Sequence, residues 1–355
     1  MSCRVVITGA SSGIGRALAR EYARAGATLG LIARRGDALL QIATECAVPT
    51  ACYALDVRDA DGLARAARDF ETKFGAADIV IGSAGISVGT LTEQAEDREV
   101  FQSVLDTNVM GLVNTFRPFL AEMREHRHGI LVGMASVAGF RGIPGSGAYS
   151  ASKAGAIAYL ESLRVELYGS GVSVVTICPG YVDTPMTQKN PYPMPFMLSA
   201  DQAAHRMVRA IEQRRAHVVI PWQMGLVGAL LKLTPRAVYD WAFARAPLSY
   251  GPYTISHRDS TSIVMVRNQH YFGAPPAAAN LTVTFMPNID VLHTNLLNGN
   301  LDAVITDRPQ AGQLPTFDQD DKAGRLHVIY VPSPIWEHID FNLDVPQLQD
   351  IRLRR

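Results

Sequence analysis

Tyr149 and Lys153, in the segment AYSASKAG, have the residue types and the spacing needed for proton transfer. Residues four apart on a helix lie on one face, so the two side chains are expected to be neighbours. A free tyrosine has a pKa of about 10, which is too high for proton exchange near neutrality. A nearby ammonium group favours the phenolate and lowers that pKa. The pair predicts a phenol that protonates a carbonyl oxygen or deprotonates an alcohol.

Two further polar side chains are candidates for the same site. Ser136 ends an expected strand in MASVAG, and its hydroxyl can hydrogen-bond the reacting oxygen. Asn108, in the helical segment DTNVMG, can hold a water beside Lys153 for proton resupply. Each residue alone has an ordinary structural interpretation, as a surface position or part of a turn. Their joint occurrence behind a phosphate-binding turn favours catalysis.

That turn is TGASSGIG, residues 8–15, which lies between an expected first strand and a helix. Glycines permit a tight turn and a close backbone approach to a pyrophosphate. The helix N-terminus offers free N–H groups and the positive end of its dipole to that anion. We expect dinucleotide contacts from Gly9, Ser11, Ser12, Gly13, Ile14 and Gly15.

The end of the second expected strand, LIARR, discriminates between two dinucleotides. An NAD site usually has an acidic residue there, which binds the ribose 2′-hydroxyl. This chain has Arg34 and Arg35, and guanidinium groups match a 2′-phosphate. We favour NADP(H); NAD(H) is the alternative, in which both arginines are solvated. Asp56 and Val57, after the third strand, are expected to contact the adenine.

Short apolar segments alternate with helical patterns along the first 220 residues. The segments begin at Arg4, Ala27, Ala51, Asp78, Gly129, Val172 and His217. Near-continuous apolar strands that alternate with helices indicate a parallel sheet covered on both faces. The expected fold class is α/β, a Rossmann doubly wound parallel sheet with helices on both faces, followed by a C-terminal α+β fragment.

Together these motifs resemble the short-chain dehydrogenase/reductase family over about residues 4–247, the expected first domain being 1–247. The resemblance implies a nicotinamide cofactor, hydride transfer to or from a carbonyl carbon, and dimers or tetramers. It implies a tetrad of Asn108, Ser136, Tyr149 and Lys153. From SAG, YSASK and PGYVDTPM it implies cofactor contacts by Ser83, Ala84, Gly85, Tyr149, Lys153, Pro179, Gly180, Val182 and Thr184. Ser83 is a departure, since the family often has Asn there.

The substrate is expected to be a small molecule, a hydrophobic ketone or alcohol or a lipid-like compound. Residues 186–200 are interpreted as a lid over the nicotinamide, apolar through Met186, Met194, Phe196 and Met197. The rest of the wall is expected from Ile86, Val88, Phe140 and Ile143, with Arg141 and Lys189 as candidate clamps for an acidic group. Alternatively, the lid residues pack the core.

The composition limits the expected partners and cellular location of the protein. The net charge is 0, so no basic field attracts nucleic acid. No secretory signal or spanning segment is recognised, and four cysteines match no zinc or disulfide framework, which favours the cytoplasm. The apolar segment MGLVGALLKL, residues 224–233, is interpreted as a buried helix or an oligomer face, with shallow membrane contact as the alternative.

The segment 248–355 has a different pattern of expected elements. A GPY turn is followed by an alternating strand, and then by a strand, a helix and a further strand. The phrases GPY, VRNQHYFG and LLNGNLDAVI resemble family 5 extracellular solute-binding proteins of the oligopeptide/dipeptide type. We interpret it as an incomplete, fused fragment without a solute-binding role. The alternative is a binding or interaction protein in which this segment is functional and the Rossmann domain is a scaffold.

Overall fold

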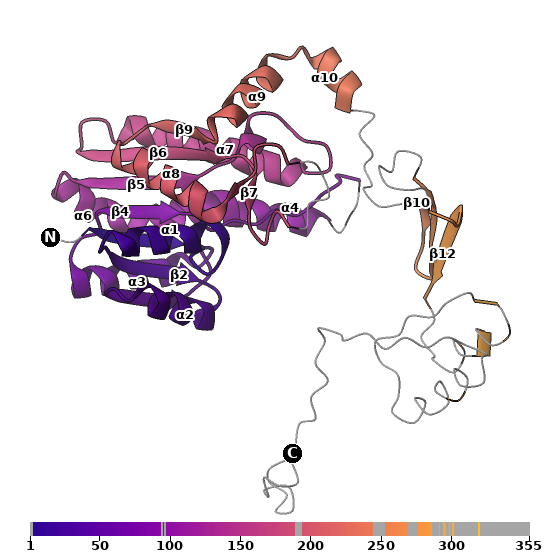
Figure 1. Ribbon diagram of the computed structural model, residues 1–355, viewed down its shortest axis with the longest axis horizontal. Helices are drawn as coiled ribbons and strands as arrows, with labels where there is room; N and C mark the ends of the chain where they lie inside the picture. The colour runs from indigo at the N-terminus through magenta and orange to yellow at the C-terminus, as the bar shows by residue number, and fades with distance from the viewer. Residues whose placement is uncertain are drawn as a thin grey trace, which may run out of the picture. The chain divides into compact units, whose positions relative to one another are not determined.

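The structure, a computed structural model, describes residues 3–93, 95, 97–188, 194–243, 253–268, 276–285 and a few positions between 291 and 319. The chain divides into two compact units, Met1–Tyr250 and Gly251–Arg355. The N-terminal unit is a central sheet between two layers of helices (Figure 1).

Seven parallel strands form that sheet, in the order β3-β2-β1-β4-β5-β6-β9. They are β1 Arg4–Thr8, β2 Thr28–Ala33, β3 Thr50–Ala54, β4 Ile79–Gly82, β5 Gly129–Met134, β6 Val172–Pro179 and β9 His217–Ile220. The winding direction reverses between β1 and β4, and doubly wound sheets bind ligands at the carboxyl ends of the strands beside such a point. The predicted fold class is confirmed.

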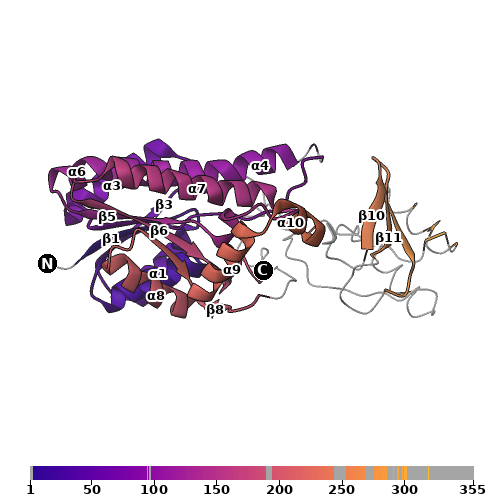
Figure 2. The ribbon, with the colours of Figure 1, turned by 90° about the horizontal axis from the view of Figure 1, so that it is seen from above.

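Helices cover both faces of the sheet, as the view in Figure 2 makes clear. One face carries α1 Gly13–Arg24, α2 Gly36–Cys46 and α8 Ala200–Glu212. The other carries α3 Ala60–Phe74, α4 Asp97–Leu105, α5 Gly111–Phe116, α6 Leu120–Glu125 and α7 Gly147–Glu166. Successive strand residues point to opposite faces, so Ile7 packs into the first core and Val6 into the second. The sheet is therefore buried on both sides.

Two short parallel strands, β7 Val182–Asp183 and β8 Leu198–Ser199, pair beyond the end of β6. Ser199 caps α8 with a capping box in which its hydroxyl accepts from the Gln202 amide. The predicted lid begins beside β7 and ends at this cap. Lys189 and the segment 189–193 lie outside the described residues.

Helices α9 Trp222–Leu233 and α10 Arg236–Phe243 follow β9. The interpretation of residues 224–233 as a buried helix is wrong. Only two residues of α9, Met224 and Gly228, are buried. Four large apolar side chains of α9 are at least 64% exposed: Trp222, Leu226, Leu230 and Leu233. On α10, Val238 and Trp241 are more than half exposed. Among the described helices none has the length and apolarity to cross a membrane.

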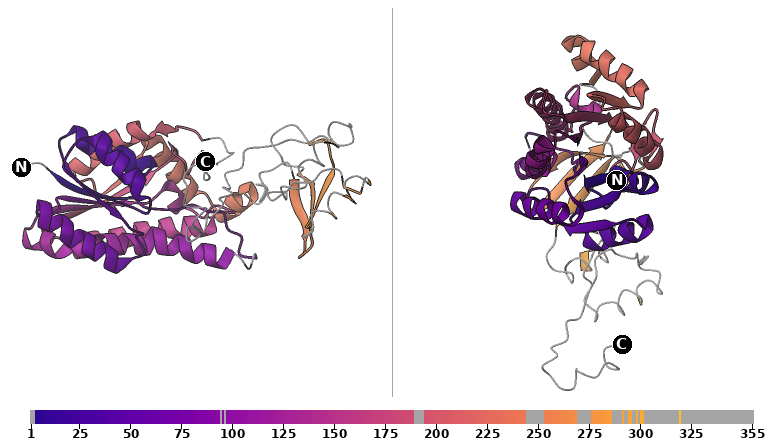
Figure 3. Two further views of the ribbon diagram at one scale, coloured as in Figure 1. Left: turned by 90° about the horizontal axis from the view of Figure 1, so that it is seen from below. Right: turned by 90° about the vertical axis from the view of Figure 1, so that its left-hand side faces the viewer.

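The C-terminal unit contains a three-stranded antiparallel sheet, β10 Tyr253–Arg258, β11 Ser262–Arg267 and β12 Asn280–Thr284 (Figure 3). Where the sequence predicted one alternating strand, the structure has the two strands β10 and β11. The Asp259 carboxylate accepts hydrogen bonds from the Thr261 and Ser262 amides, at 2.7 and 2.8 Å, and closes a turn between them. β12 agrees with the next predicted strand; the helix and strand expected after it fall largely outside the described residues.

Candidate active site

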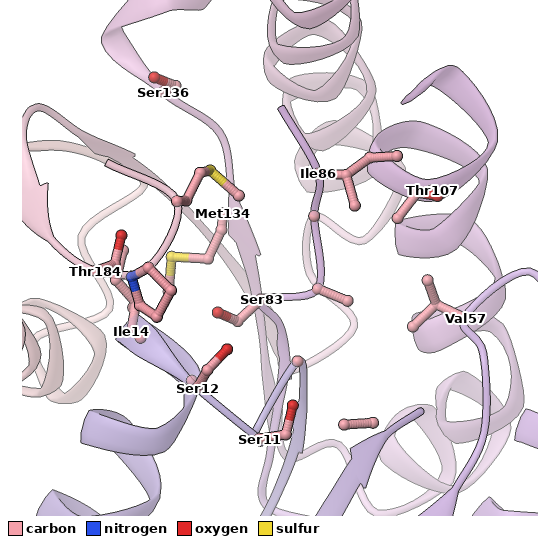
Figure 4. A pocket seen from close by; sticks show the side chains of 18 of the residues that line it. Ser11, Ser12, Ile14, Val57, Ser83, Ile86, Thr107, Met134, Ser136 and Thr184 are labelled. Atoms are coloured by element: carbon pink, nitrogen blue, oxygen red, sulfur yellow. The ribbon is translucent and has the colours of Figure 1, made fainter. Parts of the chain in front are cut away.

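A cavity of about 500 Å³ opens at the carboxyl ends of the parallel strands, where the sheet changes winding direction. Every residue predicted to contact the cofactor lines it, and so does Ser136. Figure 4 shows Ser12 and Ser83 pointing into this space, with Val57 and Thr107 across it. Asn108 lies behind the wall rather than in it.

The glycine turn between β1 and α1 forms one wall and leaves no room for side chains at two positions. A Cβ on Gly9, which has φ +70°, would lie 2.8 Å from the backbone of Ala84. A Cβ on Gly15 would lie 2.3 Å from the Gly9 carbonyl oxygen. The Thr8 hydroxyl accepts hydrogen bonds from the Ser83 and Ala84 amides, which ties the end of β1 to the end of β4. The turn is therefore a rigid backbone cradle beside a helix N-terminus, which suits a pyrophosphate.

Positive charge gathers at the ends of β2 and β3. Arg34, Arg35 and Arg58 all line the cavity, with Asp56 among them. Arg35 donates to the Ser11 carbonyl at 3.1 Å, and Arg58 binds both carboxylate oxygens of Asp56, at 3.1 and 2.8 Å. The hydrogen bond from Arg58 is the main cause that lowers the pKa of Asp56, and Arg34 adds to it. Three guanidinium groups and only one carboxylate line this end of the cavity, so its net positive charge fits a phosphate.

Arg58 was not predicted from the sequence. The available signal was its position directly after Asp56 and Val57, at the end of the third parallel strand. Other unpredicted wall residues end a strand, follow one closely, or lie in the helical segment 97–110: Ala33, Leu55, Ser103, Thr107, Met134, Ala135, Pro185 and Thr187.

Tyr149 and Lys153 lie on the cavity side of α7, with the Lys153 Nζ 5.7 Å from the centre of the Tyr149 ring. The Lys153 ammonium donates to the Met134 carbonyl at 2.8 Å, and burial lowers its pKa to about 8. Burial also raises the pKa of Tyr149, while a hydrogen bond with Ser136 lowers it by less. The net direction is opposite to the sequence-based expectation, because removal of the phenolate from water outweighs its neighbours.

Asn108 sits in a π-helical turn, Asp106–Met110, and is buried. Its Oδ1 accepts from the Ile86 amide at 2.8 Å, and its Nδ2 donates to the Ile86 carbonyl and to the Ser152 hydroxyl, both at 2.9 Å. Ser152 donates in turn to the Tyr149 carbonyl at 2.7 Å. A Cβ on Gly85 would lie 3.2 Å from the Asn108 Oδ1 and 3.6 Å from the Lys153 Nζ. Asn108 therefore joins the β4 loop to α7, directly beside the lysine.

The expected substrate wall is only partly assembled from the predicted residues. Ile86 and Met186 line the cavity. Val88, Ile143, Phe196 and Met197 do not line it, and each is more than 40% exposed. Phe140 and Arg141 turn toward α9: a Cβ on Gly228 would lie 2.3 Å from the Phe140 ring, and Arg141 donates to carbonyls at the end of that helix.

Comparison with known proteins agrees with this architecture. A family model described as short chain dehydrogenase matches residues 4–193. A second model, described as bacterial extracellular solute-binding proteins, family 5 Middle, matches residues 185–355 and so extends into the N-terminal unit.

Among curated proteins, an uncharacterized oxidoreductase of Myxococcus xanthus is 38% identical over 243 residues, which is 68% of this chain and 96% of that protein. An alcohol dehydrogenase structure from Thermococcus sibiricus, complexed with 5-hydroxy-NADP, has a TM-score of 0.56 and 29% identity, and covers 62% of this chain and 96% of its own. The L-sorbose reductase of Gluconobacter frateurii, complexed with NADPH and L-sorbose, has a TM-score of 0.57 and 25% identity, with 62% and 95% covered. The family match, this relative and the cavity together show that the chain belongs to the short-chain dehydrogenase/reductase family and is an oxidoreductase fused to a segment similar to family 5 solute-binding proteins.

Proposed function

We propose that this oxidoreductase is NADP(H)-dependent and interconverts a carbonyl and an alcohol on a hydrophobic substrate, with Tyr149 as the general acid and base. The observation that carries the proposal is one cavity that holds the glycine cradle, the arginine cluster and the Tyr149–Lys153–Ser136 group together. The two NADP-type complexes among the similar structures support the same cofactor class.

In this proposal the backbone of residues 9–15 binds the pyrophosphate, and Arg34 and Arg35 bind the 2′-phosphate. The nicotinamide, held near Thr184 and Pro179, supplies the hydride chemistry when bound. Asp56 and Val57 face the adenine. The lack of space for side chains at Gly9 and Gly15 supports this fit, because the nucleotide must approach the backbone closely.

The catalytic group works on the substrate oxygen. Tyr149 donates its proton to that oxygen in reduction and removes it in oxidation. Ser136 orients the oxygen and also hydrogen-bonds the phenol. Lys153, which keeps its proton at neutral pH because its pKa is about 8, stabilises the phenolate left after the transfer. Asn108 holds the loop at Ile86 against α7, and with it the water that resupplies the proton.

The cofactor assignment is tested by steady-state kinetics with a panel of carbonyls. We expect kcat/KM with NADPH to exceed that with NADH by about tenfold or more, since charge-assisted hydrogen bonds contribute about 1.5–3 kcal/mol. Arg34→Gln and Arg35→Gln should each remove most of this preference, whereas Arg117→Gln, at an exposed helical position outside the cavity, should leave it unchanged. A preference for NADH in the unaltered chain would contradict the proposal.

The apolar wall residues Ile86, Met134 and Met186 support a ketone or alcohol with a hydrophobic body. Arg141 was a candidate clamp for an acidic group. It instead donates hydrogen bonds to carbonyls at the end of α9, and this supports an uncharged substrate. We further propose a homo-oligomer, a dimer or tetramer, formed through the exposed apolar row of α9 and α10. A cytoplasmic location is part of the same proposal.

For residues 248–355 we propose a separate domain, incomplete and without a solute-binding function. The family model that this segment matches describes only the middle part of such a protein, which supports this. The alternative, a binding protein in which this segment acts and the Rossmann domain is a scaffold, is less well supported, because one cavity of the N-terminal unit holds Ser136, Tyr149 and Lys153 beside the glycine turn.

A further inference from the structure

The loop that follows Ser136 is attached to a part of the chain that the short chain dehydrogenase match does not cover. The match ends at residue 193, whereas α9 and α10 span residues 222–243. The loop comprises a 3-10 turn, Val137–Gly139, and then Phe140 to Gly142. Three of its residues contact α9 or α10, and those contacts bear directly on the position of Ser136.

Arg141 makes the central contact. Its Nη1 donates to the Leu231 carbonyl at 2.5 Å and to the Thr234 carbonyl at 2.6 Å. These carbonyls lie in and just beyond the last turn of α9, where they lack intrahelical partners and where the helix dipole favours a cation. The guanidinium carbon also lies 4.0 Å from the centre of the Tyr239 ring, within the range of a cation–π interaction. Arg141 therefore binds both helices at once.

Tyr239 returns the connection to the loop. Its hydroxyl donates to the Gly142 carbonyl at 2.5 Å, one residue beyond Arg141. The Tyr239 side chain is buried, and its ring stacks on Phe243 at 4.2 Å. The residues from Arg141 to Gly142 are thus held by a closed ring of contacts, which we call the clasp: Arg141, Tyr239, and the carbonyls of Leu231, Thr234 and Gly142.

Apolar contacts beside the clasp also join α9 to residues near the cavity. Phe140 fills the space over Gly228, so closely that a Cβ there would lie 2.3 Å from its ring, and it stacks on His217. Met224 lies against Gly180, a cavity residue. Among the described residues of α9 and α10, the buried ones are Met224, Gly228 and Tyr239, and each faces a loop that adjoins the cavity. Besides strand β9, the two helices therefore contact loops beside the cavity.

We propose that Arg141 and Tyr239 are positioning residues for the reduction: through the clasp they hold the loop behind Ser136, and with it the serine hydroxyl that orients the substrate oxygen. This inference rests on the proposed function of Ser136. It assigns α9 and α10 as the outer support of the substrate site. Neither residue contacts the nucleotide half of the cavity, so the clasp acts on substrate orientation and leaves nucleotide binding alone.

The first test measures the loop itself and needs no substrate. In the full chain, hydrogen–deuterium exchange reports the Gly139 and Phe140 amides, which donate to the Ser136 and Val137 carbonyls at 3.0 and 3.1 Å. Arg141→Gln should accelerate their exchange by about tenfold, since it removes a helix-end hydrogen bond and a cation–π contact. Arg236→Gln, an exposed arginine on α10, is the matched control and should not. Unchanged exchange in Arg141→Gln would overturn the proposal, whatever happens to activity.

The second test separates positioning from general stability. Arg141→Gln should lower kcat for carbonyl reduction by about tenfold while the Kd for NADPH stays within twofold. In Arg141→Lys, which keeps the charge, kcat should be higher than in Arg141→Gln but still below that of the unaltered chain. In Tyr239→Phe, which keeps the ring, kcat should fall less than in Arg141→Gln. A parallel loss of NADPH binding and kcat would overturn the proposal in favour of a merely structural role. If the unaltered chain reduces no carbonyl, the proposed function fails, but the exchange result still decides whether the clasp holds the loop.

Discussion

Burial controls the chemistry of Tyr149 and Lys153 more strongly than their mutual attraction does. Removal from water disfavours both charged forms, so it raises the pKa of the phenol and lowers that of the ammonium. The Ser136 hydroxyl opposes the shift at Tyr149 through a hydrogen bond. At neutral pH the site therefore holds a protonated phenol beside a protonated lysine, which is the state that carbonyl reduction requires.

This protonation state predicts different pH profiles for the two directions. Oxidation needs the phenolate, and because the pKa of Tyr149 is raised, kcat/KM for alcohol oxidation should rise by about tenfold per pH unit from pH 6 into the alkaline range. Reduction uses the protonated phenol, so its kcat/KM should stay level across neutrality. Initial rates at several pH values in both directions measure this. An oxidation rate that is level or falls between pH 6 and 8 would contradict it.

The four-residue spacing of Tyr149 and Lys153 was enough to predict that both face one site, because a helix fixes that geometry. The direction of the tyrosine pKa shift was not predictable, since it depends on how much protein covers the phenol, and that comes from chain segments far away in sequence. Arg58 was missed for a related reason: its guanidinium turns toward Asp56 only once β3 has placed both at the sheet edge.

At the scale of elements, the parallel strands and the glycine turn were predictable because each has a local signature. Apolar runs marked the strands, and the steric need for glycine marked the turn. The π-helical turn around Asn108 has no such signature, since it inserts one extra residue into an otherwise helical pattern. Its structural result is that the Asn108 amide reaches Ile86 and Ser152 together.

Helix α9 illustrates the limit of composition as a guide to burial. Its apolar residues suggested a buried helix, yet its contact face is formed by Met224 and Gly228, and large side chains such as Leu233 stay exposed. Small residues permit a close approach of Phe140, so a narrow face suffices to hold the helix. Which face packs depended on that loop and not on the pattern within α9.

For the whole molecule, the two family matches correspond to two kinds of architecture. The N-terminal unit is a parallel sheet with helices on both faces, and the C-terminal unit contains the antiparallel sheet β10-β11-β12. Short sequence motifs alone predicted both resemblances. The solute-binding match nevertheless begins at residue 185, earlier than the expected boundary at residue 248. A family model follows residue similarity, whereas the contacts keep residues 185–250 with the N-terminal unit.

Removing residues 248–355 tests whether the C-terminal segment takes part in the activity. Because the candidate active-site cavity is lined by residues of the N-terminal unit, we expect kcat/KM to stay within about twofold and the melting temperature to fall by a few degrees at most. Light scattering of the shortened chain should give the mass of a dimer or tetramer, because the α9–α10 row is retained. Loss of folding would instead show that the segment is integral to the protein.

In the proposed reaction the Tyr149 hydroxyl moves the proton. The most direct measurement is the kcat of NADPH-dependent carbonyl reduction in Tyr149→Phe, with NADPH affinity followed separately by fluorescence titration. We expect kcat to fall by about 10²–10⁴ while the Kd for NADPH changes little, because general acid catalysis is lost and the glycine turn that holds the dinucleotide is intact. Tyr168→Phe, the same change at a residue that is 91% exposed, should behave as the unaltered chain. Turnover retained in Tyr149→Phe would contradict the account.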